Sequence, residues 1–240
     1  MPEAHDTYVD WLQVENWAFA EAARRGMNVA VPSCPGWSVE DLVVHHASFQ
    51  LWITELVVER AQEPVAPPER RPPAGMGALE WFDAVSERFV DTLRRTDPET
   101  PVWVVTGEQR AGAWARRQAS ETSVHRWDAQ HARGAGLAIE HAPDYLAEMF
   151  TLLLPNLIRS FGAPMPAGAL VLRSTDDRSV WTVRPAADTI EMVPEGDPAD
   201  AALTGSTSDL FLALWGRPTD IQVQGDRSVL EQWRTAIAGA

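Results

Sequence analysis

Four segments in the first part of the chain repeat their apolar residues every three to four positions. They run from Thr7 to Arg25, Ser38 to Arg60, Ala78 to Thr96 and Ala113 to Arg133. This spacing brings side chains onto one face of a helix, so each segment predicts a helix. Four such helices fit a four-helix bundle, where metal sites form from side chains on facing helices.

Local signals sharpen these boundaries. Ser38 precedes the second segment and Asp41 lies three residues later, which predicts a capping box at the start of that helix. Residues 62–77 contain five prolines among charged residues and predict a loop. A further helix is expected from Pro143 to Arg159, interrupted at Pro155.

The pattern changes after residue 160. Residues 161–168 (FGAPMPAG) read as a linker because they are rich in proline and glycine. The sequence therefore predicts an all-α domain over residues 1–160 and a small α+β domain over residues 169–240. In the second domain we expect strands at 169–174, 180–185, 189–194, 201–204 and 221–224, and helices at 208–215 and 228–237.

The composition excludes several classes of function. The net charge of -14 argues against DNA, RNA or an anionic membrane as partner, since each attracts a basic surface. All 20 basic residues are arginine, which excludes Schiff-base lysine chemistry. With Cys34 as the single cysteine, a metal would need histidine and carboxylate ligands. No signal peptide or apolar run of about 20 residues is present, so a cytoplasmic protein is expected.

Two clusters could supply such ligands. Glu121 and His125 are four residues apart on the fourth predicted helix, so their side chains lie one turn apart, with Asp128 on the same face. The alternative is an ordinary solvated helix face. His45 and His46 flank the apolar stripe of the second helix, and both are expected to turn inward. They could be hydrogen-bonded imidazoles instead, and the periodicity does not choose which one would be a ligand.

Three motifs carry a resemblance to a known family: CPGWSVEDLVVHH at 34–46, ETSVHRWDA at 121–129 and LWGRP at 214–218. In this order they resemble the mycothiol-dependent maleylpyruvate isomerase family, a DinB-like group common in actinobacteria. The resemblance covers nearly the whole chain. It implies a DinB-like metal-binding bundle followed by a C-terminal α+β domain.

The resemblance also implies a set of site residues. A divalent metal, usually zinc, would be held by His45, Glu121 and His125, with His46 as the alternative to His45. Asp128 and Arg217 match residues that the family uses around the thiol and the substrate. Arg217 could bind a substrate carboxylate through its planar guanidinium, or it could be a surface arginine at a helix end.

The expected function follows from the resemblance and from the chemistry of zinc. Three protein ligands leave one coordination position open, as in catalytic zinc sites. A low-molecular-weight thiol, mycothiol by resemblance, would be activated there as a thiolate and would add to a small electrophilic alkene. Addition, rotation and elimination make an isomerase, whereas release of the adduct makes a thiol S-transferase. The alternative of another class is a protein that binds a metal or ligand without turnover.

Overall fold

A computed structural model describes residues 4–64, 66–193 and 196–238 of the chain. Within it the chain divides into two compact units. The first comprises Met1–Val104 and Glu108–Ile139, and the second comprises Val105–Gly107 and Glu140–Ala240. In the described residues no helix is long and apolar enough to cross a membrane.

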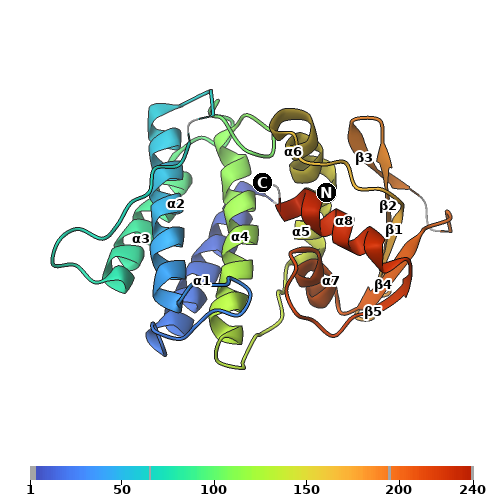
Figure 1. Ribbon diagram of the computed structural model, residues 1–240. Helices are drawn as coiled ribbons and strands as arrows, with labels where there is room; N and C mark the ends of the chain where they lie inside the picture. Colours follow the sequence, from blue (N-terminus) through green and yellow to red (C-terminus); the bar gives the residue numbers. More distant parts are fainter. Residues whose placement is uncertain (1–3, 65, 194–195, 239–240) are drawn as a thin grey trace. The chain divides into compact units, whose positions relative to one another are not determined.

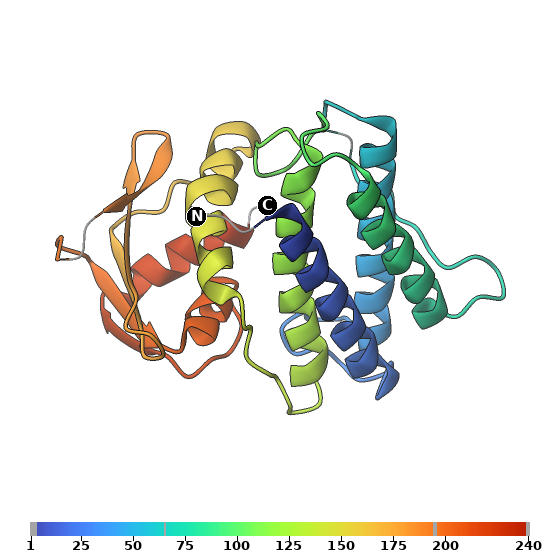
Figure 2. The same cartoon turned by 180° about the vertical axis from the view of Figure 1, so that it is seen from behind.

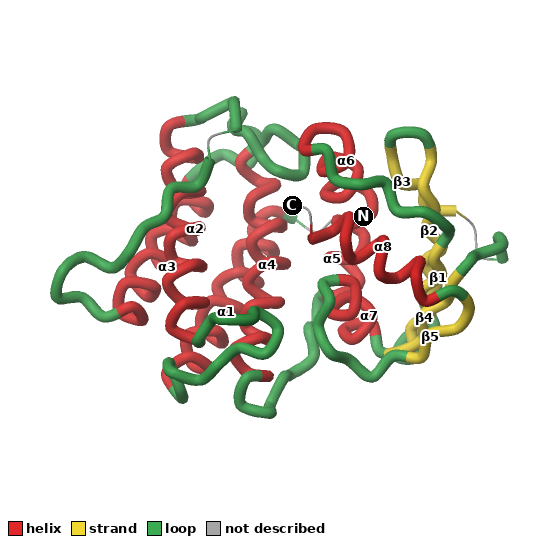
Figure 3. The backbone as a smooth tube through the Cα atoms, in the orientation of Figure 1, coloured by secondary structure: helices red, strands yellow, loops and turns green. Residues whose placement is uncertain are grey.

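The first unit is built from four long helices (Figures 1 and 3). They are α1 (His5–Arg24), α2 (Val39–Glu59), α3 (Ala78–Arg95) and α4 (Ala111–His131). Helix α1 packs mainly on α4, and α2 packs mainly on α3. The four helices expected from the apolar periodicity are thus confirmed, and so is the all-α class of this region.

The start of α2 is fixed by the predicted capping box. The Ser38 hydroxyl accepts a hydrogen bond from the Asp41 backbone N–H at 3.2 Å, and the Asp41 carboxylate accepts one from the Ser38 backbone N–H at 2.9 Å. These bonds satisfy two donors that the first turn of a helix leaves unpaired. The capping box therefore sets where α2 begins, and with it the positions of the histidines two turns later.

The core of the bundle is aromatic and aliphatic. Phe19 of α1 contacts Phe82 of α3 edge to face, with ring centroids 5.1 Å apart. The Trp114 ring of α4 is fully buried and donates from Nε1 to the Trp103 carbonyl at 2.8 Å. A buried indole needs such a partner for its N–H. Several tryptophans of this chain are thus core residues.

A buried ion pair joins α1 to α4. Arg126 donates from Nε to the Glu15 carboxylate at 2.5 Å, and both side chains are about nine-tenths buried or more. The same guanidinium donates to the carbonyls of Leu137 and Ala138. Removing one partner of a buried pair leaves an uncompensated charge, which costs about 3–5 kcal/mol. This pair therefore fixes α4 against α1.

The second unit combines helices with one mixed sheet (Figure 2). The sheet has the order β3-β2-β1-β4-β5, in which β1 and β4 are parallel and the other neighbours antiparallel. The expected strands and helices are all present, so the α+β class is confirmed. Residue 194, the expected end of the third strand, lies outside the described residues. Their bounds are α5 (Ala142–Glu148), η1 (Met149–Leu153), α6 (Leu154–Phe161), β1 (Leu170–Ser174), β2 (Val180–Ala186), β3 (Thr189–Val193), β4 (Ala201–Gly205), α7 (Thr207–Leu214), β5 (Gln222–Gly225) and α8 (Arg227–Ala238).

The division between the units lies earlier than the boundary expected at 161–168. Helices α5 and α6 and the turn η1 between them belong to the second unit. Tyr145 of α5 packs on Phe211 of α7, and Phe150 of η1 packs on Trp233 of α8, each at 5.8 Å between ring centroids. Residues 161–168 connect α6 to β1 within one unit. Proline and glycine signal a break in regular structure, and here that break is a turn inside a domain.

The interruption expected at Pro155 is present. Pro155 lies in the first turn of α6, where its missing N–H costs no hydrogen bond. The preceding residues, Met149–Leu153, form a π-helical turn (η1). Single π-helical turns occur mostly inside α-helices, and here one joins α5 directly to α6.

Candidate metal centre

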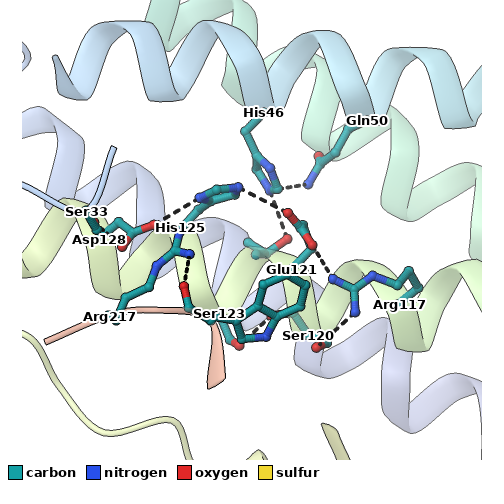
Figure 4. A network of polar contacts seen from close by, with 12 residues as sticks. Ser33, His46, Gln50, Arg117, Ser120, Glu121, Ser123, His125, Asp128 and Arg217 are labelled. Atoms are coloured by element: carbon teal, nitrogen blue, oxygen red, sulfur yellow. Dashed lines mark hydrogen bonds and ion pairs between the residues drawn. The ribbon is translucent and has the colours of Figure 1, made fainter. Parts of the chain in front are cut away.

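Three ionisable side chains, Arg117, Glu121 and His125, follow one another along helix α4 at intervals of four residues (Figure 4). The Nε2 atom of His125 lies 3.2 Å from Oε1 of Glu121. The other oxygen of Glu121, Oε2, accepts a hydrogen bond from the Arg117 guanidinium. The spacing i, i+4, i+8 brings all three onto one helix face. One carboxylate oxygen is thus held by arginine and the other lies beside the imidazole.

The second nitrogen of His125 also faces a carboxylate. Its Nδ1 lies 3.2 Å from Oδ2 of Asp128, and Oδ1 of Asp128 accepts a hydrogen bond from the Ser33 hydroxyl at 2.5 Å. Ser33 comes from the loop between α1 and α2. The His125 ring is therefore oriented from both sides by carboxylates, and the loop serine fixes one of these carboxylates.

The charges of this cluster explain its protonation. Burial lowers the pKa of His125, but its hydrogen bonds to Asp128 and Glu121 and the charges of both outweigh that and raise the pKa to about 9. Burial acts to raise the pKa of Glu121, but the charge of Arg117 and the contact with His125 hold it well below its ordinary value. With the Glu121 carboxylate ionised beside His125, this position favours a cation.

The two adjacent histidines of α2 have different environments. The His45 ring is exposed and has two aromatic neighbours, the Trp37 ring at 4.9 Å and the Phe49 ring at 6.3 Å between centroids. Its centroid lies 5.9 Å from that of His125. The His46 ring is buried, and its centroid lies 5.3 Å from that of His125. The expectation that both turn inward is wrong for His45, because consecutive helical residues point about 100° apart.

His46 is held by a buried polar network. Its Nε2 lies 2.9 Å from the Thr122 hydroxyl of α4 and 3.2 Å from the Gln50 amide nitrogen. The Gln50 amide also donates to Asn16 of α1 at 2.7 Å. Burial lowers the pKa of His46 well below its ordinary value. His46 therefore links three helices as a neutral imidazole.

His45 and His46 also differ in the hydrogen bonds that their ring nitrogens make. Within the described part of the chain, His45 makes no hydrogen bond through either nitrogen. An imidazole needs an available nitrogen lone pair to bind a metal. In His46 only the buried Nδ1 lacks a hydrogen bond, whereas neither nitrogen of the exposed His45 ring makes one within the described residues.

Two donor atoms of this cluster have the spacing of neighbouring zinc ligands. A tetrahedral ion with bonds of about 2.0–2.1 Å holds neighbouring ligand atoms about 3.3 Å apart. The Glu121 Oε1 and His125 Nε2 atoms are 3.2 Å apart. An Asp carboxylate on the far nitrogen of the histidine is the usual outer-shell partner in zinc sites. Among the described residues, no group of three such side chains is already placed to hold a metal ion.

The structure therefore brings four of the five predicted site residues together in the first unit. His45, Glu121, His125 and Asp128 lie around one cluster, whereas Arg217 belongs to the second unit. There Arg217 is half-buried and donates to the Trp215 carbonyl at 2.8 Å. It also lines a cleft of about 260 Å³ in that unit.

Sequence reasoning missed Arg117 and Ser33. Arg117 could have been found, because it precedes Glu121 by the same four residues that separate Glu121 from His125. Ser33 reaches Asp128 across 95 residues of sequence. No local pattern signals that contact, because it depends on the path of the loop between α1 and α2.

These features define a class of protein: a helical bundle with a carboxylate–imidazole cluster on one helix, followed by an α+β unit. The family model described as the mycothiol maleylpyruvate isomerase N-terminal domain matches residues 13–130, and the model of the C-terminal domain of the same family matches residues 140–232. The chain belongs to the mycothiol maleylpyruvate isomerase family, a family of enzymes.

Solved structures agree on the fold. Crystal structures of the mycothiol-dependent maleylpyruvate isomerase and of one of its mutants superpose on this chain with a TM-score of 0.60. Each is 15% identical in sequence, and the match covers 92% of this chain and 93% of the other. A search among curated proteins gave no match.

Proposed function

We propose that this protein is a zinc-dependent enzyme that uses a low-molecular-weight thiol, mycothiol, to modify a small electrophilic alkene. The spacing of the Glu121 and His125 ligand atoms at 3.2 Å carries this proposal. Family membership supports mycothiol as the thiol, since the name of the family includes mycothiol. The alkene follows from the name of the structural neighbours, which are isomerases of maleylpyruvate.

His45, Glu121 and His125 are the proposed zinc ligands. His45 is preferred over His46 because its ring is exposed and makes no hydrogen bond among the described residues, whereas Nε2 of the buried His46 ring contacts Thr122 and Gln50. When bound, zinc would lower the pKa of a thiol at its open position and so supply a thiolate at neutral pH. Arg117 donates a hydrogen bond to Oε2 of Glu121, which leaves Oε1 as the proposed metal-binding atom.

The chemistry of a thiol toward an activated alkene explains the isomerisation. The sulfur forms a bond to one alkene carbon, and a proton is taken up at the neighbouring carbon. Rotation about the resulting single bond follows, and loss of a proton from that neighbouring carbon together with the thiolate restores the alkene in the other geometry. A substrate whose adduct cannot eliminate would leave as a thioether, which would make the same site an S-transferase.

A combined assay tests the proposal. The purified protein is analysed for zinc and then mixed with a panel of thiols and activated alkenes, with products followed by mass spectrometry. The proposal expects about one equivalent of zinc, a preference for mycothiol, and isomerised alkene without net thiol consumption. Stable adducts would assign S-transfer instead. A protein that takes up no zinc and turns over no alkene would be a non-catalytic ligand-binding protein.

Asp128 is proposed to act through His125, because its carboxylate contacts Nδ1 of that ring. We expect Asp128→Asn to weaken zinc binding about 10- to 100-fold, since outer-shell partners orient metal ligands. Competition with a zinc-sensitive dye measures this change. Ser33→Ala removes only the hydrogen bond to Asp128 and should have a smaller effect in the same direction. Unchanged zinc affinity in Asp128→Asn, with weaker thiol binding, would return Asp128 to the expected role beside the thiol.

Arg217 is proposed to bind a substrate carboxylate. Its guanidinium lines the cleft of the second unit together with Arg227 and Arg234. We expect Arg217→Ala to leave the zinc content intact and to raise KM for a carboxylate alkene about 10-fold, as for a lost charge-assisted hydrogen bond. The matched control is Arg159→Ala, an exposed arginine on α6. Loss of the fold or of zinc in Arg217→Ala alone would make Arg217 a structural residue.

A further inference from the structure

Beside His45 lies a cleft of about 330 Å³ that belongs entirely to the first unit. One wall is the N-terminal half of α2, and the other is the proline-rich loop that joins α2 to α3. The exposed edge of the cleft is formed in part by Trp37, which packs on the His45 ring. A molecule in this cleft would contact the proposed zinc ligand that is accessible to solvent.

The proline-rich loop is anchored to α2 on this side. Arg70 donates from both terminal nitrogens to the two Glu55 carboxylate oxygens, at 2.5 and 2.6 Å. Its backbone N–H donates to the Ser48 hydroxyl at 3.1 Å, and that hydroxyl donates to the Pro68 carbonyl at 3.0 Å. A bidentate arginine–carboxylate pair fixes geometry as well as adding energy. The loop is thus held where its next residue, Arg71, lines the cleft.

Arg71 is an arginine without an ion-pair partner among the described residues. The charge of Arg71 acts on the nearby Asp41 carboxylate, but that carboxylate accepts its hydrogen bonds from the Ser38 backbone and hydroxyl. Arg70, in contrast, forms an ion pair with Glu55. The guanidinium of Arg71 therefore lines the cleft and is available to bind an external anion. The guanidinium of Arg70 instead holds the loop against α2.

We infer that Arg71 is a specificity-determining residue that binds a carboxylate of the alkene substrate in the cleft beside His45. The inference rests on the proposed function and adds a second recognition element to it. Guanidinium and carboxylate match in shape and charge. Trp37 supplies a flat apolar wall for the unsaturated part of the same molecule. The enzyme would therefore select alkenes that carry an acid group on this side of the reacting carbons.

The test measures binding of maleate and of its uncharged dimethyl ester to the zinc-loaded protein by titration calorimetry. We expect Arg71→Gln to weaken maleate binding about 5- to 20-fold, the modest size reflecting the solvent exposure of the pair. Binding of the ester should not change. The matched control is Arg95→Gln on α3, an exposed arginine paired with Asp91 and absent from the cleft.

A second variant tests the sign of the effect. Glu69 lines the same cleft, so Glu69→Gln should strengthen maleate binding about 2- to 3-fold by removing a repulsive charge. Equal maleate affinity in wild type and Arg71→Gln would overturn the inference. So would an equal loss of affinity for maleate and the ester, because that result does not report recognition of the substrate carboxylate.

The two proposals can fail separately. If the wild-type protein holds zinc and isomerises alkenes but Arg71→Gln binds maleate normally, the role of Arg71 is refuted and the proposed function stands. If the protein takes up no zinc, the proposed function fails. The comparison of maleate with its ester on the metal-free protein then still decides whether Arg71 binds a carboxylate.

Discussion

His125→Ala is expected to remove most of the bound zinc and to reduce turnover to the level of the free thiol. The reason is that His125 offers Nε2 beside Glu121 Oε1 while Asp128 holds its other nitrogen. The loss of a direct ligand should exceed the change of about 10- to 100-fold that follows loss of an outer-shell partner. Elemental analysis after dialysis against a weak chelator measures the bound zinc, and alkene turnover is followed in parallel.

The matched control is His131→Ala, which removes another histidine from the same helix. His131 stacks on Trp127 at 4.3 Å between ring centroids and belongs to no part of the cluster. The zinc content of the His131→Ala protein should equal that of wild type. Full zinc occupancy in a folded His125→Ala protein would show that the Glu121–His125 pair is not a metal site.

The adjacent histidines of α2 should give opposite results. We expect His45→Ala to lose zinc while keeping the stability of the fold, because the His45 ring is exposed and makes no described hydrogen bond. His46→Ala should keep zinc but lower the free energy of unfolding by about 2–4 kcal/mol. The lost ring leaves a cavity beside Phe19 and Phe82, and Thr122 loses a buried partner.

Zinc analysis and urea denaturation of both variants measure the two effects together. His46→Gln is a useful third variant, because an amide can keep one of the buried hydrogen bonds and should recover part of the stability. The reverse pattern, with zinc lost in His46→Ala and kept in His45→Ala, would make His46 the ligand. It would also mean that the buried network rearranges when the metal binds.

Most of the fold could be predicted from the sequence, because helices and strands leave local patterns. The apolar periodicity of Ala78 to Thr96 and the capping box at Ser38 each depend on a few neighbouring residues. The boundary between the units could not be predicted in this way. It depends on Tyr145 and Phe150 packing against helices that lie more than 60 residues further along the chain.

By itself, the sequence determined the elements and the Glu121–His125 pair, since helical pitch alone brings residues four apart together. Tertiary structure decided which histidine of α2 makes a buried hydrogen bond, because the packing of α2 buries His46 against α4 and leaves His45 at the surface. It also brought Ser33 to Asp128 and fixed the loop that carries Arg71. Such contacts depend on how loops run between packed helices, and no periodicity in the chain encodes that path.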